Sequence, residues 1–496
     1  MENTKTNKSF SFFEMAISLY TAGLPRGIDP VDMRNTFLPI FFLASADKQH
    51  NSSHKPTLPE GYYGTELMQR LIDAPANNVC KMVDEALKAI ENSNYTTIEC
   101  KSHPLTNICF AELESKYDTD VFSEYVCEVA KIVSRENLTT FLMEDEDYAH
   151  HIFVDLVEDF SKRFPETAQY TTPHDIVDLM RNLVMARTWL ENRLPIRKTF
   201  DPACGVGYAL THCGGSEVYG QEISPTTYTL ANMAMLLSGR KAHIALGDSL
   251  NSPNFWSEIS RGEFDVAVST PPLNVSNWKK TTDYDAAYHW GVPSDHYGEW
   301  AFISQMLSSV NGENGMVCVT CSAGALFRAG EEQTIRKRVF EDNLIDAIVR
   351  LPFRTLFNSP TQILVVVFRK GRKSDDGILY LDLGTQYKRS KGRNELVLDP
   401  NVEIQNIYAN FLEGKNAEIQ DIAKVVRYAD LKAGLEGGNR LFLLQPFQAQ
   451  EQDKMTFKQT RAYWEKTIDK INDRLKKRNT QLASERKWLM DHKSDQ

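Results

Sequence analysis

The sequence lacks the features of membrane and disulfide-rich proteins. No apolar run approaches the roughly 20 residues that a membrane-spanning helix needs. The nearest candidate, residues 36–46, is too short and contains Pro39. No signal peptide is expected, because Glu14 interrupts the apolar stretch near the N-terminus. The 8 cysteines in 496 residues are too sparse for a disulfide scaffold. A cytoplasmic protein without membrane contact is therefore expected.

Basic residues are also fewer than acidic residues. Lys and Arg total 56 against 66 Asp and Glu, and the formal charge of -10 argues against a global attraction to nucleic acid. A local basic patch remains possible. Cys318 and Cys321 form a lone C-x-x-C, but they lie in an apolar run that predicts a buried strand, and no second ligand pair accompanies them. No metal site is predicted.

Residues 1–165 are predicted to form a helical N-terminal domain. Apolar residues recur there at helical spacing in five stretches: 10–20, 33–46, 79–90, 124–133 and 148–160. No strand-rich stretch and no catalytic motif accompanies them. The pattern therefore favours an accessory domain over a catalytic one.

Residues 166–375 have the sequence pattern of an α/β domain. Seven short β-branched runs alternate with helical stretches, at 198–200, 217–219, 243–246, 264–269, 315–320, 344–351 and 362–368. Such alternation is typical of a doubly wound, largely parallel sheet, here with seven strands. Ligands of these sheets lie beyond the carboxyl ends of the strands. The chemistry is therefore expected just after these runs.

The rest of the chain is predicted to form two further segments. Residues 376–450 have a mixed pattern, with a short strand at 378–383, and are interpreted as an α/β extension of the catalytic domain. In residues 451–496 apolar side chains recur every seven residues, at Ile468, Leu475, Leu482 and Leu489. This spacing predicts a C-terminal amphipathic helix that packs on another helix. Docking on a partner subunit is the favoured interpretation, and folding back on the same chain is the alternative.

Acidic residues follow three successive predicted strands. Asp201 precedes a glycine turn at 205–207, where glycine lets the backbone approach a ligand closely. Leu210 stands where a dinucleotide fingerprint needs its third glycine, which weakens a dehydrogenase interpretation. Glu222 is placed to accept both hydroxyls of a ribose, and Asp248 is placed to accept an adenine amino group. Together they predict a nucleoside cofactor site.

A fourth motif, Thr270-Pro-Pro-Leu273, follows the next predicted strand. Together with DPACGVG at 201–207, GQEISPTTY at 220–228 and GDSL at 247–250, it resembles the modification subunit of type I restriction–modification systems. That family consists of N6-adenine DNA methyltransferases. The resemblance implies a Rossmann-like methyltransferase domain that binds S-adenosylmethionine and methylates adenine N6 in DNA.

The resemblance also implies which residues form the site. The implied cofactor-binding residues are Tyr170, Thr172, Pro173, Asp201, Ala203, Gly205, Gly207, Glu222, Asp248 and Ser249. The implied catalytic residues are Thr270, Pro271, Pro272 and Leu273. Here Thr270 replaces the family's Asn, which bonds the adenine amino group, and Leu273 replaces its aromatic residue, which stacks on the flipped base. We therefore expect impaired catalysis by this chain, and an altered but active site is the alternative.

The partners implied by the resemblance are double-stranded DNA and a specificity subunit that reads the target sequence. A second methyltransferase subunit and a restriction subunit are further candidates. Local basic residues would contact DNA, and the candidates are Lys279, Lys280, Arg328, Arg336 and Lys337. Two other functions stay open. One is a non-catalytic paralogue that binds cofactor and supports an active partner, and the other is a methyltransferase acting on a protein or small-molecule amine.

Overall fold

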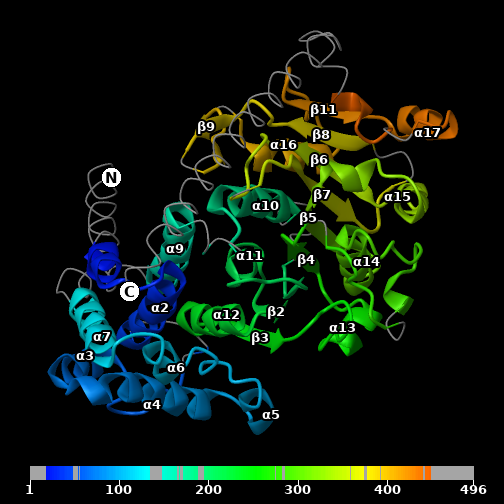
Figure 1. Ribbon diagram of the computed structural model, residues 1–496. Helices are drawn as coiled ribbons and strands as arrows, with labels where there is room; N and C mark the ends of the chain where they lie inside the picture. Colours follow the sequence, from blue (N-terminus) through cyan, green and yellow to red (C-terminus); the bar gives the residue numbers. More distant parts are fainter. Residues whose placement is uncertain are drawn as a thin grey trace, which may run out of the picture. The chain divides into compact units, whose positions relative to one another are not determined.

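The computed structural model describes most of the chain (Figure 1). The described residues are 18–47, 54, 56–134, 148–164, 167, 171–187, 195–273, 275–281, 285–357, 359–373, 377–390, 392–400, 402–439 and 442–447. The chain divides into two compact units, Met1–Arg440 and Leu441–Gln496. The C-terminal amphipathic helix predicted at 451–496 lies outside the described residues.

Helices build the N-terminal part of the first unit. They are η1 (Leu24–Arg26), α2 (Pro30–Ser45), α3 (Gly64–Asp73), α4 (Ala76–Asn94), α5 (Thr97–Cys100), α6 (Phe110–Glu114), α7 (Thr119–Val133) and α9 (Tyr148–Arg163). α2 begins where the Asp29 carboxylate accepts the N–H of Val31 at 2.8 Å. It is buried around most of its circumference because α3, α7, α9 and α12 all pack on it. The apolar run at 36–46 is therefore part of a core helix.

A nine-stranded sheet forms the centre of the remaining part of the first unit, in the order β11-β8-β6-β7-β5-β4-β1-β2-β3. The strands are β1 (Lys198–Asp201), β2 (Glu217–Glu222), β3 (Lys241–Leu246), β4 (Val266–Ser269), β5 (Met316–Ser322), β6 (Ile345–Arg350), β7 (Ile363–Arg369), β8 (Ile378–Asp382) and β11 (Ala423–Val426). β1 to β5 pair in parallel, whereas β7 runs antiparallel between β5 and β6. The mixed α/β fold class is confirmed, and all seven predicted strands are present.

The predicted number of strands is wrong. β8 pairs with β6 in parallel, and β11 pairs with β8 antiparallel, so both continue the main sheet beyond the seven strands. The short β9 (Tyr387–Arg389) and β10 (Asn394–Leu396) pair with each other in a separate two-stranded sheet. Segment 376–450 therefore contributes two strands to the sheet, of which β11 forms the edge.

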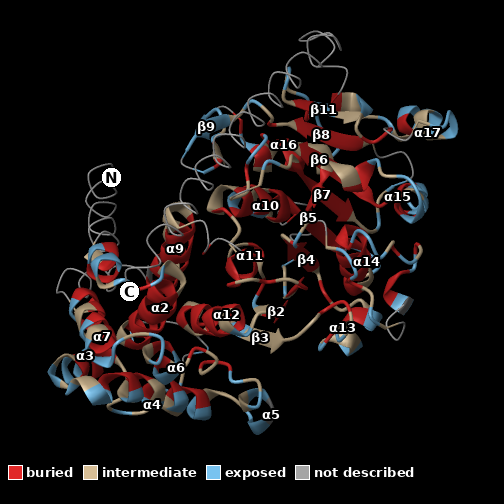
Figure 2. Ribbon diagram, viewed as in Figure 1, coloured by how far each residue is buried: buried red, intermediate tan, exposed pale blue. Residues whose placement is uncertain are grey.

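Helices cover both faces of the sheet (Figure 1). α10 (His174–Ala186), α11 (Tyr208–Cys213), α12 (Pro225–Ser238) and α16 (Ile404–Leu412) lie on one face. α13 (Trp256–Arg261), α14 (Glu299–Ser309) and α15 (Glu331–Glu341) lie on the other, and η4 (Asp285–Ala287) and η5 (Ala323–Leu326) lie between them in sequence. α17 (Tyr428–Glu436) begins at Tyr428, whose ring stacks on Phe340 of α15. The central strands are consequently buried on both sides (Figure 2). This explains their continuous β-branched sequences.

The C-x-x-C pair lies inside this buried sheet. Cys318 and Cys321 both belong to β5 and are fully buried. Burial raises the pKa of both thiols well above the usual value. Both cysteines therefore serve as small apolar side chains of the core.

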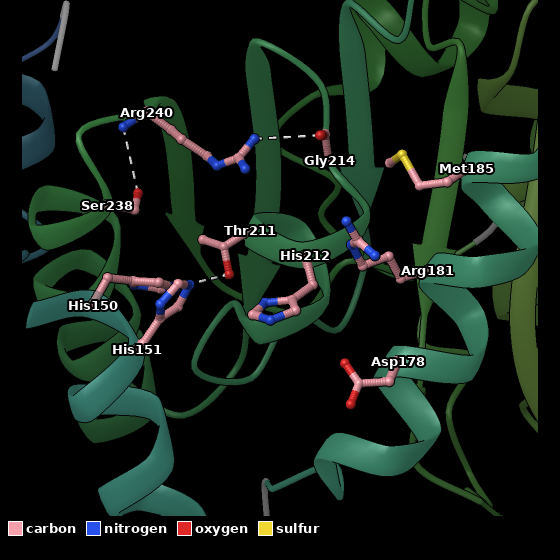
Figure 3. Close-up of a pocket in the computed structure, with 10 residues that line it drawn as sticks. All are labelled: His150, His151, Asp178, Arg181, Met185, Thr211, His212, Gly214, Ser238 and Arg240. Atoms are coloured by element: carbon pink, nitrogen blue, oxygen red, sulfur yellow. Dashed lines mark hydrogen bonds between the residues drawn. The ribbon is translucent and has the colours of Figure 1, made fainter. Parts of the chain in front are cut away.

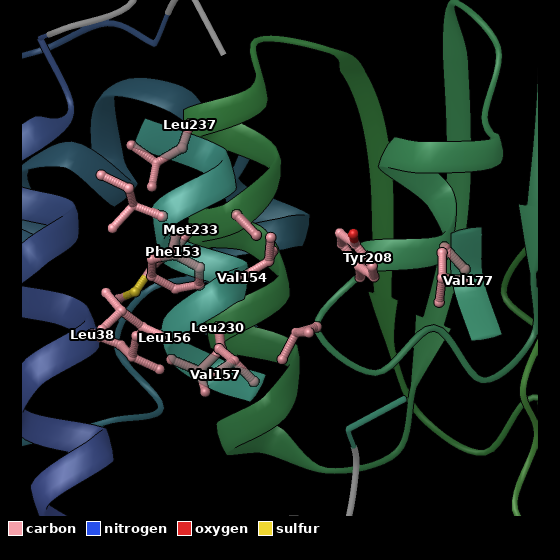
Figure 4. Close-up of a cluster of buried hydrophobic side chains, with 14 of the residues drawn as sticks. Leu38, Phe153, Val154, Leu156, Val157, Val177, Tyr208, Leu230, Met233 and Leu237 are labelled. Carbon is pink, nitrogen blue, oxygen red and sulfur yellow. The ribbon is translucent and has the colours of Figure 1, made fainter. Parts of the chain in front are cut away.

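One apolar cluster joins the helical part to the sheet part (Figure 4). Leu38 of α2 and Phe153 and Val157 of α9 meet Leu230 and Met233 of α12, and all five are buried. α12 follows β2, so the helices of the N-terminal part pack directly on a helix of the sheet. Among the described helices none is long and apolar enough to cross a membrane.

Candidate functional site

A cavity of about 580 Å³ lies at the carboxyl ends of β1 to β5. Loops that follow β1, β2, β3 and β4 line it, together with the loop after β6. Ten predicted site residues share its wall: Thr172, Ala203, Gly205, Glu222, Asp248, Ser249, Thr270, Pro271, Pro272 and Leu273. The structure thus brings together residues that are up to 101 positions apart in the sequence, from Thr172 to Leu273.

Three more predicted residues lie behind the residues that line the cavity. Asp201, at the end of β1, accepts the N–H of Ala203 at 2.9 Å and so holds the turn. Gly207 has a φ of 84°, and a Cβ there would lie 2.2 Å from the Met235 Cε atom. Pro173 is buried and provides the N-cap position of α10. The remaining predicted residue, Tyr170, lies outside the described residues.

Two carboxyl groups of the site are nearly inaccessible to solvent. Asp201 is 1% exposed and Glu222 is 5% exposed. Burial raises the pKa of Asp201 to about 7 and also raises the pKa of Glu222. Glu222 accepts the N–H of Gly205 at 3.0 Å on one oxygen and that of Ser224 at 2.8 Å on the other. Each oxygen retains a second lone pair, so Glu222 can still accept hydroxyls of a ligand.

The third carboxylate, Asp248, organises the loop after β3. One oxygen accepts the N–H of Leu250 at 3.1 Å, and the other accepts the side-chain amide of Asn251 at 2.8 Å. The ammonium of Lys280 lies 3.5 Å from that second oxygen and stays 69% exposed. Lys280 therefore belongs to the rim of the cavity, where its charge is shared with Asp248.

The two departures from the family motif have defined surroundings. The Thr270 hydroxyl is hydrogen-bonded to the Thr172 hydroxyl, so its short side chain is already engaged. Leu273 is partly buried against the main apolar core and offers no ring. Both residues nevertheless line the cavity. The loop after β4 thus still lines the cavity, although two of its side chains differ from those of the family motif.

Sequence reasoning missed several aromatic residues of this cavity. Trp278, Phe302 and Phe357 line it, and none was assigned to the site. Phe357 comes from the loop after β6, and the guanidinium of Arg393 lies 5.2 Å from its ring centroid.

Two basic residues predicted to contact DNA have structural roles instead. Arg336 is 1% exposed and donates to the carbonyls of Ala325 at 3.2 Å and Arg328 at 3.1 Å. Arg328 forms an ion pair with Glu299 at 2.6 Å and lies over the Tyr297 ring. The prediction is therefore wrong for Arg336 because the residue is buried, and the charge of Arg328 is already paired.

The other basic candidates remain available on the surface. Lys337 is 54% exposed and lies 3.7 Å from Glu341. Lys279 is placed by its backbone N–H, which donates to the Asp295 carboxylate at 3.0 Å. A contact between DNA and Lys279, Lys280 or Lys337 therefore stays a prediction.

Comparison with known proteins defines the family. Residues 144–435, more than half of the chain, match the family model described as N-6 DNA Methylase. The chain belongs to the N-6 DNA methylase family. This membership confirms the resemblance seen in the motifs and implies S-adenosylmethionine as the cofactor.

Curated relatives of this chain are methylase subunits of type I restriction enzymes. The MjaVIII subunit of Methanocaldococcus jannaschii is 31% identical over 252 residues, which cover 45% of this chain and 43% of that protein. The MpnII subunit of Mycoplasma pneumoniae is 29% identical over 250 residues, covering 46% and 45%. The chain thus spans less than half the length of each of these relatives.

Solved structures share the fold of this chain. A type I restriction–modification methyltransferase subunit from Streptococcus thermophilus is 16% identical, with a TM-score of 0.67, and the match covers 87% of this chain and 99% of that chain. A structure of a type I restriction–modification system has a TM-score of 0.61 at 16% identity, covering 90% and 99%. At such identities the likeness establishes the fold alone.

Proposed function

We propose that the chain transfers the methyl group of S-adenosylmethionine to N6 of adenine in double-stranded DNA, as the modification subunit of a type I restriction–modification complex. One observation carries the proposal. A single cavity joins the turn after β1, Glu222 at the end of β2 and Asp248 after β3 to the Thr270–Leu273 loop after β4. A cofactor side and a substrate side therefore meet in one space, as methyl transfer requires.

The cofactor side fits a cationic nucleoside. S-adenosylmethionine carries an ammonium and a sulfonium and supplies an electrophilic methyl group when bound. Asp201, Glu222 and Asp248 provide carboxyl groups at three successive strand ends, and Glu222 is placed to accept the ribose hydroxyls. The cavity of about 580 Å³ lies within the range of small-molecule sites.

The substrate side has lost part of its usual chemistry. The Pro271 carbonyl and the Thr270 hydroxyl remain as acceptors for an adenine amino group, but the hydroxyl is shared with Thr172. A lost hydrogen bond and a lost stacking contact each cost about 1–3 kcal/mol. Together they would slow the reaction by roughly two to four powers of ten. We therefore propose that this chain is a weak catalyst by itself.

The same two residues favour one alternative. A non-catalytic paralogue that binds cofactor and supports an active methyltransferase partner would keep Asp201, Glu222 and Asp248 and lose the Asn and the aromatic of the β4 loop. Both proposals share a specificity subunit and a restriction subunit as partners, by analogy with the type I methylase subunits that the chain resembles. Both also place the protein in the cytoplasm, where such DNA is found.

One assay distinguishes these proposals. Labelled methyl transfer from S-adenosylmethionine to double-stranded DNA is measured for the chain alone and together with a specificity subunit, and N6-methyladenine is identified by mass spectrometry. Slow transfer that depends on the specificity subunit supports the first proposal. Cofactor binding without any transfer supports the paralogue. Absence of cofactor binding in both preparations contradicts both proposals.

A further inference from the structure

A second cavity, of about 470 Å³, is lined by the residues drawn in Figure 3. Gly214 lies three residues before β2, and Arg240 directly precedes β3, so both mark the amino ends of these strands, whereas the cofactor cavity lies at carboxyl ends. The remaining wall comes from α9, α10, α11 and the last residue of α12. The cavity is therefore separate from the one at the carboxyl ends.

Basic side chains from four elements line this cavity. Arg181 comes from α10, Arg240 from the start of β3, His151 from α9 and His212 from α11 (Figure 3). Within the part of the chain that the structure describes, Arg181 forms no hydrogen bond or ion pair. Arg240 donates to the carbonyls of Gly215 at 2.9 Å and Gly214 at 3.3 Å, which position its guanidinium beside the cavity.

Three histidine rings lie next to one another along one wall. The ring centroids of His150 and His151 are 5.9 Å apart, as are those of His151 and His212. The Nδ1 atom of His212 is buried and has no hydrogen-bond partner among the described residues. Burial first, and then the charge of neighbouring groups that include Arg181 and Arg240, lower the pKa of His212 to about 3. His212 is therefore neutral, and the positive charge of the wall comes from Arg181 and Arg240.

We propose that this cavity binds a small phosphate-bearing anion, independently of the cofactor. Guanidinium groups bind phosphate by charge-assisted hydrogen bonds, and Arg181 and Arg240 approach from different elements. His212 Nδ1, which has no partner among the described residues, offers a further polar contact in the same wall. Among the described residues that line the cavity Asp178 alone is acidic, and it would accept a hydroxyl of the ligand.

A small anion fits this place better than DNA. The target base must reach the β4 loop, which lies at the carboxyl edge, whereas these cations lie at the amino edge of β2 and β3. The cavity of about 470 Å³ exceeds what one phosphate needs and has room for a nucleotide. Free phosphate and a nucleotide both carry the phosphate group, so a binding experiment has to distinguish between these two ligands.

Calorimetric titration of the full-length protein tests the proposal. The ligands are inorganic phosphate, uridine monophosphate and uridine. Phosphate or the monophosphate should bind at one site, and uridine should not. Arg181→Gln should weaken binding by about tenfold or more, because a charge-assisted contact is lost. His212→Gln is a second variant at a residue from another element. Tighter binding of the monophosphate than of phosphate would identify a nucleotide, and equal binding would identify free phosphate.

A matched control removes an arginine elsewhere. Arg427 is exposed and pairs with Asp430, so Arg427→Gln should bind phosphate as the wild type does. Thermal melting and S-adenosylmethionine binding confirm that each variant is folded. Equal phosphate affinity in wild type and Arg181→Gln would overturn the proposal, as would the absence of binding by both anions. Competition by duplex DNA but by neither small anion would assign these cations to DNA and overturn it as well.

Discussion

The two cavities lie at opposite ends of the same strands and have opposite chemistry. At the carboxyl ends of β2 and β3, Glu222 and Asp248 face an acidic cavity, whereas Arg181 and Arg240 face a cationic cavity near the amino ends of these strands. Burial shifts groups at both ends toward their neutral forms: it raises the pKa of Asp201 to about 7 and lowers that of His212 to about 3. Each cavity therefore favours a ligand that brings the opposite charge.

The difference also lies in how the groups are held. Backbone N–H groups of glycine and serine loops hold Glu222, which suits a carboxylate that stays an acceptor. Hydrogen bonds to the Ala234 carbonyl and the Thr211 hydroxyl, both at 3.0 Å, hold His150, and the His212 ring lies tilted at 48° against the Tyr208 ring, 3.9 Å between centroids. The acceptors of the acidic cavity lie in loops that follow strands. The donors of the basic cavity lie near helix ends that precede strands.

The largest effect is expected in the β4 loop. The double substitution Thr270→Asn with Leu273→Phe should raise adenine methylation by roughly two to four powers of ten, because it restores a hydrogen-bonding amide and a stacking ring. Labelled methyl transfer to DNA in the presence of a specificity subunit measures the gain. Adding Glu222→Ala to the double variant should remove it. Unaltered turnover in the double variant would show that these departures do not limit catalysis.

The next effect compares the two ends of β2. Glu222→Gln should weaken S-adenosylmethionine binding roughly ten- to hundredfold, since a hydrogen bond to a charged group contributes about 1.5–3 kcal/mol. Glu217 lies at the other end of the strand, where it pairs with Lys241 at 2.7 Å, so Glu217→Gln is the matched control. Calorimetry should show normal cofactor affinity in the control. Equal losses in both variants would mean that the charge of Glu222 has no specific role.

A smaller effect is expected from the glycine turn after β1. Gly207→Ala should lower the free energy of unfolding by about 1–3 kcal/mol, because its φ of 84° disfavours a side chain and Met235 lies where the Cβ would be. Gly392 has the same φ of 84°, and no atom of the described residues lies within 4 Å of where its Cβ would be, so Gly392→Ala isolates the backbone strain. Urea unfolding measures both. If the two variants lose equal stability, packing against Met235 contributes nothing.

The acidic cavity could be predicted from the sequence far better than the basic one. Asp201, Glu222 and Asp248 each follow a strand directly, and parallel strands bring their carboxyl ends to one edge. The basic cavity depends on Arg181 and His212, which lie on separate helices whose relative rotation is set by tertiary packing. No motif connects them in the sequence.

Two wrong expectations have the same physical origin. Arg336 carries a charge that suggests a surface position, but the carbonyls of Ala325 and Arg328 satisfy its guanidinium inside the fold. β11 has four residues, Ala423–Val426, and becomes a strand through its pairing with β8. Local sequence predicts neither outcome, because partners distant in the sequence decide both.

The smallest effect is the pH dependence of stability, which should have opposite signs at the two cavities. His150 and His212 have pKa values of about 3 in the folded chain, below the ordinary 6.5, so the unfolded chain binds more protons between these values. Their contribution to stability is present above pH 6.5 and is lost as the pH falls. Asp201 has a pKa of about 7 against an ordinary 3.8, so its contribution is present below pH 3.8 and is lost as the pH rises toward 7.

Two variants separate these contributions. The free energy of unfolding is measured by urea at several pH values between about 5.5 and 7.5, on either side of the ordinary histidine value. His212→Gln should lose less stability than the wild type on acidification, and Asp201→Asn should lose less on going to neutral pH. His296 is exposed, and His296→Gln should follow the wild-type profile. If the His212 and Asp201 variants shift the profile in the same direction, the two cavities do not have the opposite electrostatic character assigned to them.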